Sequence, residues 1–177
     1  LRHARDADVG SRARVFEPSM TFAKHTLAVA DAALSLVHAH RRGTLKLVSL
    51  RGEPRNWRNF LSALGTVRTL KPDLHVVTAD GQFEDHWFIE VARATESIPV
   101  LIRKSEVYCD YYQSGTEQRK VGVFPKVLWL LPTEQRVARF FEALRHDLRL
   151  IPRLFIVTTT ERLIEAIRAP DTGAEAA

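Results

Sequence analysis

The fold of this chain is decided by residues 72–93, which read PDLHVVTADGQFEDHWFIEVAR. Two runs rich in β-branched and aromatic residues flank an Asp-Gly turn, and this arrangement is a strong local signal for an antiparallel hairpin. Because side chains alternate along a strand, Phe88, Glu90 and Ala92 share one face of the second run. A carboxylate between apolar neighbours is costly to bury without a partner. Glu90 is therefore the first candidate for a functional residue.

Asp73 is the second candidate, and it lies at the start of the first run. In an antiparallel hairpin the start of one strand lies beside the end of the next, so Asp73 and Glu90 are expected to converge. Two carboxylates that face one point are the usual minimum for holding Mg²⁺ together with waters and a phosphate oxygen. The hairpin thus predicts a possible metal site formed by the carboxylates of Asp73 and Glu90.

Outward from the hairpin, the spacing of apolar residues and the capping residues predict the other elements. We expect helices over residues 19–42, 97–114, 133–148 and 161–168, and residues 57–64 could make a short amphipathic helix. We expect further strands over residues 45–50, 126–131 and 154–159. Hairpin strands followed by alternating helices and strands predict an α/β domain in which helices flank a mixed central sheet.

Three segments are expected along the chain. Residues 1–18 are rich in arginine and lack a clear period, so we interpret them as a basic arm or a linker from a missing upstream region. The first residue, Leu1, is not methionine, and this fits that interpretation. Residues 19–169 form the α/β domain, and the small, polar residues 170–177 form a frayed tail.

The composition excludes several classes of protein. The chain has 177 residues, of which 45% are hydrophobic, and this suits one globular domain. No stretch reaches the roughly 20 uncharged apolar residues of a membrane span. The single cysteine, Cys109, excludes an internal disulfide and a multi-thiolate zinc site, and it falls on an apolar helix face. We expect a cytoplasmic protein without a membrane partner, and we find no serine nucleophile motif, Walker loop or dinucleotide glycine pattern.

The positive charge is concentrated in the first part of the chain. The formal net charge of +5 combines +8 for residues 1–71 with −3 for the remainder. A clustered positive field favours a polyanion such as DNA. A solvated basic face with no partner would explain the same charges equally well. The candidate nucleic-acid-binding residues are Arg41, Arg42, Lys46, Arg51, Arg55 and Arg58.

Further motifs surround the acid pair in a fixed order. They comprise residues 25–29, Glu53 with Trp57-Arg58, Pro72-Asp73, residues 90–96, residues 108–112 and Phe124-Pro125. With these motifs the chain resembles the bacterial replication-relaxation family of plasmid and mobile-element proteins. More broadly, it resembles the PD-(D/E)xK nuclease-like core, whose element order is αβββαβ.

The resemblance implies a fold, a metal site and a partner. It implies a restriction-endonuclease-like α/β core in which Asp73 and Glu90 bind Mg²⁺ or Mn²⁺ if the protein is active, and an upstream winged-helix region. The nuclease pattern has a lysine at the position of Ala92, where its ammonium would orient water and offset charge on the phosphate. Alanine does neither. Lys104 or Arg103, on the next predicted helix, could project back to replace that lysine.

Three hypotheses about function remain open. We favour a catalytically degenerate, DNA-binding protein of plasmid or mobile-element replication. The alternatives are a Mg²⁺-dependent DNA endonuclease or nickase, with Asp73, Glu90 and Lys104 as catalytic residues, and a dimerising regulator that uses the core as a scaffold. His25 and His75 are possible neighbours of the site, although packing is the more common role of such histidines. Tyr111 is a minor candidate for base stacking.

Overall fold

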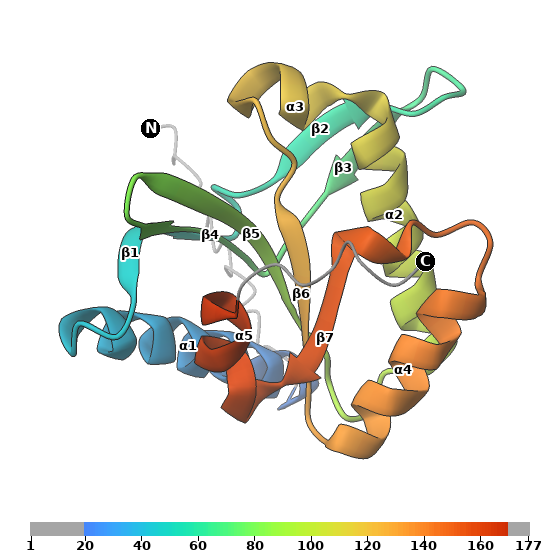
Figure 1. Cartoon of the computed structure of the whole chain (residues 1–177). Coiled ribbons are helices and arrows are strands. Elements are labelled where there is room, and N and C mark those ends of the chain that lie inside the picture. The colour runs from blue at the N-terminus through green and yellow to red at the C-terminus, as the bar shows by residue number, and fades with distance from the viewer. Residues whose placement is uncertain (1–19, 170–177) are drawn as a thin grey trace, which may run out of the picture.

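The molecule, described here from a computed structural model, is built on one five-stranded sheet (Figure 1). The structure describes residues 20–169, so the predicted arm over residues 1–18 and the tail over residues 170–177 lie outside it. The strand order in the sheet is β1-β4-β5-β6-β7, and β2 and β3 pair separately. The α-helices and β-strands are α1 (Met20–Arg41), β1 (Lys46–Gly52), β2 (Arg58–Leu61), β3 (Val67–Leu70), β4 (Leu74–Asp80), β5 (Phe83–Val91), α2 (Ile98–Ser114), α3 (Thr116–Val121), β6 (Lys126–Leu131), α4 (Glu134–His146), β7 (Phe155–Thr159) and α5 (Leu163–Arg168).

The central sheet is mixed, as predicted. β4 pairs antiparallel with both β1 and β5, whereas β5, β6 and β7 run parallel to one another. The predicted hairpin is β4–β5, in which Leu74 pairs with Ile89 and Asp80 pairs with Phe83. Gly81 lies between the two strands and has φ +57°, a left-handed conformation that glycine adopts without strain.

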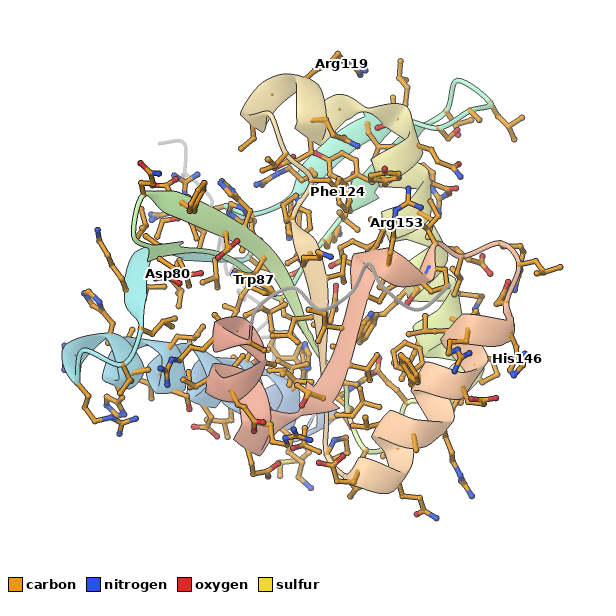
Figure 2. All side chains as sticks on the ribbon, in the orientation of Figure 1. Asp80, Trp87, Arg119, Phe124, His146 and Arg153 are labelled. Carbon is orange, nitrogen blue, oxygen red and sulfur yellow. The ribbon has the colours of Figure 1, made fainter. Side chains whose placement is uncertain are left out.

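Helices cover both faces of the sheet, and the alternation of side chains along β5 shows how. Trp87 and Ile89 pack with residues of α1 and α5, whereas Phe88 packs with residues of α2 and α4. Figure 2 shows side chains filling the spaces between the sheet and these helices. After Lys126, β6 is buried on both faces, and this explains the unbroken apolar sequence of residues 127–131. The prediction of an α/β fold with a mixed, helix-flanked sheet is confirmed.

The predicted helix over residues 57–64 is wrong, because this region belongs to the β2–β3 hairpin. Its apolar residues have helical spacing, but Phe60 is buried while Leu61 and Leu64 are exposed. The turn closes through a hydrogen bond from the Ser62 amide to the Thr66 carbonyl oxygen, and Gly65 supplies a positive φ. Packing of Phe60 and Leu70 against the α2 side of the core outweighs the local preference for a helix.

Cys109 is buried within α2, and burial raises the pKa of its thiol to about 11. The thiolate is thus disfavoured, which agrees with a packing role. Tyr111 is also buried, so it is not available for stacking against a base. None of the helices within residues 20–169 combines the length and the apolar character that crossing a bilayer requires.

Candidate functional site

The β4–β5 hairpin brings the two predicted acids to one end of the sheet. Asp73 directly precedes β4, and Glu90 lies one residue before the end of β5, next to the Leu74–Ile89 pair. Both carboxylates are buried, since Asp73 is 8% exposed and Glu90 is 3% exposed. The convergence predicted from the hairpin is therefore present, but in the interior of the protein rather than in an open cleft.

Asp73 is held by two elements. Its Oδ1 lies 3.0 Å from Nε2 of His25 on α1, and its Oδ2 accepts a hydrogen bond of 2.7 Å from the amide of Val91. The hydrogen bond to Asp73 raises the pKa of His25, although partial burial of the ring opposes this effect. His25 thus lies beside the acid pair and connects the first turns of α1 to the start of β4.

Glu90 is held by α2. Its Oε1 accepts a hydrogen bond of 2.5 Å from the Tyr108 hydroxyl, and its Oε2 lies 3.7 Å from Nζ of Lys104. Burial raises the pKa of Glu90 to about 8 and the charge of Asp73 adds to this, while Lys104 and Tyr108 act in the opposite direction. Without a further cation, Glu90 is mostly protonated near neutral pH.

Lys104 reaches the acid pair from α2, as the sequence suggested. Its Nζ also lies 3.6 Å from Oε1 of Glu96 and 5.8 Å from the centre of the Trp129 ring. Burial alone would lower the pKa of Lys104, but the carboxylates of Glu90, Glu96 and Asp73 outweigh it and raise the pKa. Lys104 is therefore a charged ammonium that lies between the buried carboxyl groups of Glu90 and Glu96.

The other positions considered for the lysine of the motif differ from Lys104. The Ala92 side chain is buried and uncharged, and the Arg103 side chain is exposed to solvent. The Arg93 guanidinium lies 3.4 Å from Oε1 of Glu96, and the backbone amide of Arg93 donates a hydrogen bond to Oε2 of Glu96. Glu96 and Tyr108 are site residues that our sequence reasoning missed. Tyr108 lies four residues after Lys104 and thus on the same helix face, which is a signal that the sequence does contain.

The arrangement does not fit a divalent cation. Each oxygen of Asp73 and Glu90 already has a protein partner. No cluster of three or more His, Cys, Asp or Glu side chains suited to an ion exists within residues 20–169. The Lys104 ammonium supplies the positive charge that a metal would bring.

Five of the six predicted DNA-binding residues lie along one edge of the sheet. Arg41 ends α1, Lys46 begins β1, and β1 is an edge strand of the central sheet (Figure 1). All five side chains are exposed, and together they follow the length of β1 and the turns at its ends: Arg41, Arg42, Lys46, Arg51 and Arg55. We call this set the basic edge.

Arg58 does not belong to the basic edge. Its Nε lies 3.0 Å from Oε2 of Glu117, whose side chain is fully buried, and the Tyr111 hydroxyl donates to the same carboxylate. The neighbouring His75 has a pKa lowered to about 4, first by burial and then by the charge of Arg58. Arg58 is thus an internal partner of α3 and is not available to bind a phosphate.

A model of one protein family matches most of the chain. The family is described as replication-relaxation, and the match covers residues 2–127. The chain belongs to the replication-relaxation family. No curated protein matches the chain.

The replication-relaxation match contains both functional candidates described above. It includes the acid pair with His25, Lys104 and Tyr108, and it includes the whole basic edge. α4, β7 and α5 lie beyond it, so they complete the sheet and its helical cover outside the matched region. The candidate sites thus belong to the part of the chain that defines it as a replication-relaxation protein.

Proposed function

We propose that this replication-relaxation protein binds DNA in plasmid or mobile-element replication and does not cleave it, using a nuclease-like core as a scaffold. The observation that carries the proposal is the closed acid pair: Asp73 and Glu90 are buried, and every carboxylate oxygen has an internal partner. Metal-dependent phosphodiester cleavage needs carboxylates that are open to a metal and to a phosphate. The element order and the mixed sheet agree with the αβββαβ core that the sequence resembles.

The basic edge is the proposed DNA-binding surface. β1 has seven residues, so at about 3.3 Å per residue it extends over roughly 20 Å. Exposed arginines and lysines along that length neutralise successive phosphates of a duplex without reading its sequence. We therefore expect binding that depends on DNA charge more than on DNA sequence.

The first test is the salt dependence of DNA binding. If all five residues of the basic edge contact phosphates, the logarithm of the binding constant should fall with the logarithm of salt concentration with a slope of about −4.5. Replacing all five by glutamine should weaken binding and bring the slope close to zero. Fluorescence anisotropy with a labelled duplex measures both quantities.

The matched control replaces two exposed arginines of α4, Arg139 and Arg145, far from the basic edge in Figure 1. This variant should keep the slope of the wild type. A wild-type slope near zero, or an equal loss in the α4 variant, would contradict the proposed surface.

One observation favours a second candidate function. The Lys104 ammonium lies 3.7 Å from Glu90, where a displaced lysine of a metal-dependent DNA endonuclease or nickase would be expected. For that function Mg²⁺ or Mn²⁺ would have to displace the internal partners of the acid pair.

A nicking assay separates the two functions. We expect the wild-type protein to leave supercoiled plasmid intact in the presence of Mn²⁺, and calorimetry to show no binding of Mg²⁺ or Mn²⁺. Nicking by the wild type that disappears in both Glu90→Ala and Lys104→Ala would overturn our proposal in favour of the endonuclease. Nicking that persists in both variants would indicate a contaminating nuclease, and the calorimetric result would then decide.

A further inference from the structure

The outer face of α1 is apolar although it faces solvent. Met20, Leu27 and Leu34 follow one another at intervals of seven residues, and they are 74%, 64% and 53% exposed. Seven residues make almost two turns of an α-helix, so these three side chains lie in one line along it. The line lies opposite Ala32 and Leu36, which are buried against the sheet. A seven-residue apolar repeat is the pattern of a helix that packs lengthwise against another helix.

The flanks of this line differ from each other. Ala23 and Ala30 follow one side, and their small side chains allow a second helix to come close. Lys24 and Asp31 follow the other side, and neither forms an ion pair with any residue of the described range 20–169. We call Met20, Leu27 and Leu34 with these two flanks the α1 seam.

We propose that a second copy of this chain covers the α1 seam, with the two α1 helices antiparallel about a twofold axis at Leu27. In this register Leu27 contacts Leu27 of the partner subunit, and Met20 contacts Leu34 of the partner subunit. The alanine flanks meet each other in the same register. The seam therefore complements itself, as a twofold interface between identical subunits requires.

The charges select the antiparallel arrangement. Around the axis at Leu27, Lys24 comes opposite Asp31 of the partner subunit, and symmetry produces this pair twice. In a parallel pair of helices, Lys24 would lie at the same height as Lys24 of the partner subunit. No carboxylate would then lie opposite its ammonium group. Opposite charges on the flanks of an apolar seam are what sets the orientation of paired helices.

The seam is accessible for such a contact. α1 lies along the outside of the molecule, beneath the sheet in Figure 1, and α5 lies beside it. Leu163 of α5 lines a pocket together with Ser35 and His38, which lie in the second half of α1, and Leu27 is exposed. The overlap covers two heptads, which corresponds to a small interface, so we expect a dissociation constant in the micromolar range.

The first experiment measures oligomeric state and contact at the proposed axis. Analytical ultracentrifugation of the whole chain up to about 100 µM, well above the expected micromolar range, should show a concentration-dependent dimer. Under mild oxidation, Leu27→Cys should form a disulfide-linked dimer. Thr21→Cys, which is exposed but lies six residues from the axis, should not, because its two copies would be about 18 Å apart along the helices. Cys109 is the single native cysteine and is buried, so it does not interfere.

The second experiment tests the charge pair by exchange. Lys24→Glu and Asp31→Lys should each weaken the dimer about tenfold or more, since each places like charges opposite each other twice. The double variant should recover the wild-type dissociation constant. A monomer at every concentration, equal cross-linking of Leu27→Cys and Thr21→Cys, or no recovery in the double variant would each overturn the proposal. A monomeric wild type would mean that another partner, or residues outside the described range, covers the seam.

Discussion

Replacing Arg58 with alanine is expected to lower the free energy of unfolding by about 3–5 kcal/mol, because it leaves a buried charge without a partner. Arg58 binds the carboxylate of Glu117, which has no exposed surface. After the substitution the Tyr111 hydroxyl would be the one hydrogen-bond donor to that carboxylate left among residues 20–169. Because the pair connects β2 to α3, we expect the β2–β3 hairpin to lose its attachment first. Urea denaturation followed by circular dichroism measures the change.

Two variants show whether the effect comes from the buried pair. Arg55→Ala removes an exposed arginine three residues earlier, and it should change the free energy of unfolding by less than about 0.5 kcal/mol. Replacing Arg58 and Glu117 together with Met and Leu should recover most of the lost stability, because no unpaired charge remains. A loss below about 1 kcal/mol in Arg58→Ala would show that the pair contributes little.

Replacing Glu90 with glutamine is expected to stabilise the protein above neutral pH. The pKa of Glu90 rises from 4.5 to about 8 in the folded protein, first because the carboxyl is fully buried. The folded state therefore keeps a proton that the unfolded state has lost, and stability falls as pH rises from about 4.5 to about 8. The difference in pKa corresponds to a loss of roughly 3–5 kcal/mol across this interval. Glutamine has the same shape, accepts the Tyr108 hydrogen bond and does not ionise.

The measurement compares the two proteins across pH. The free energy of unfolding of Glu90→Gln minus that of the wild type should grow between about pH 5 and about pH 8.5. His25 also loses a stabilising charge as pH rises through its raised pKa, but this contribution is common to both proteins. Glu84→Gln, at an exposed position of the same strand, is the control and should show no trend. If the free energies of unfolding of the wild type and Glu90→Gln change with pH in parallel, the raised pKa of Glu90 would be contradicted.

Much of the fold follows from local sequence patterns. The Asp-Gly turn with strand-forming runs on both sides predicted the β4–β5 hairpin, and the alternation within it placed Glu90 opposite the start of β4. Helical spacing with caps predicted α1, α2 and α4, and the unbroken apolar run predicted β6. These features depend on neighbours within a few residues, whose geometry is set by the backbone itself.

The same local rules gave wrong predictions where a residue packs against segments that are distant in the sequence. Residues 57–64 have helical spacing, yet the burial of Phe60 against α2 makes them part of a hairpin. Arg58 was indistinguishable by sequence from the exposed arginines around it, because its partner Glu117 is 59 residues away.

For the candidate site, the sequence determined that Asp73 and Glu90 lie together and that Lys104 could reach them. Only the tertiary structure decided that α1 and α2 cover the acid pair. His25 of α1 contacts the Asp73 carboxylate, and Tyr108 and Lys104 of α2 contact the carboxyl group of Glu90. The reason is physical: strand pairing sets which residues are adjacent, whereas the packing of helices on the sheet sets how much water reaches them. The free energy of a buried carboxylate depends on that second quantity.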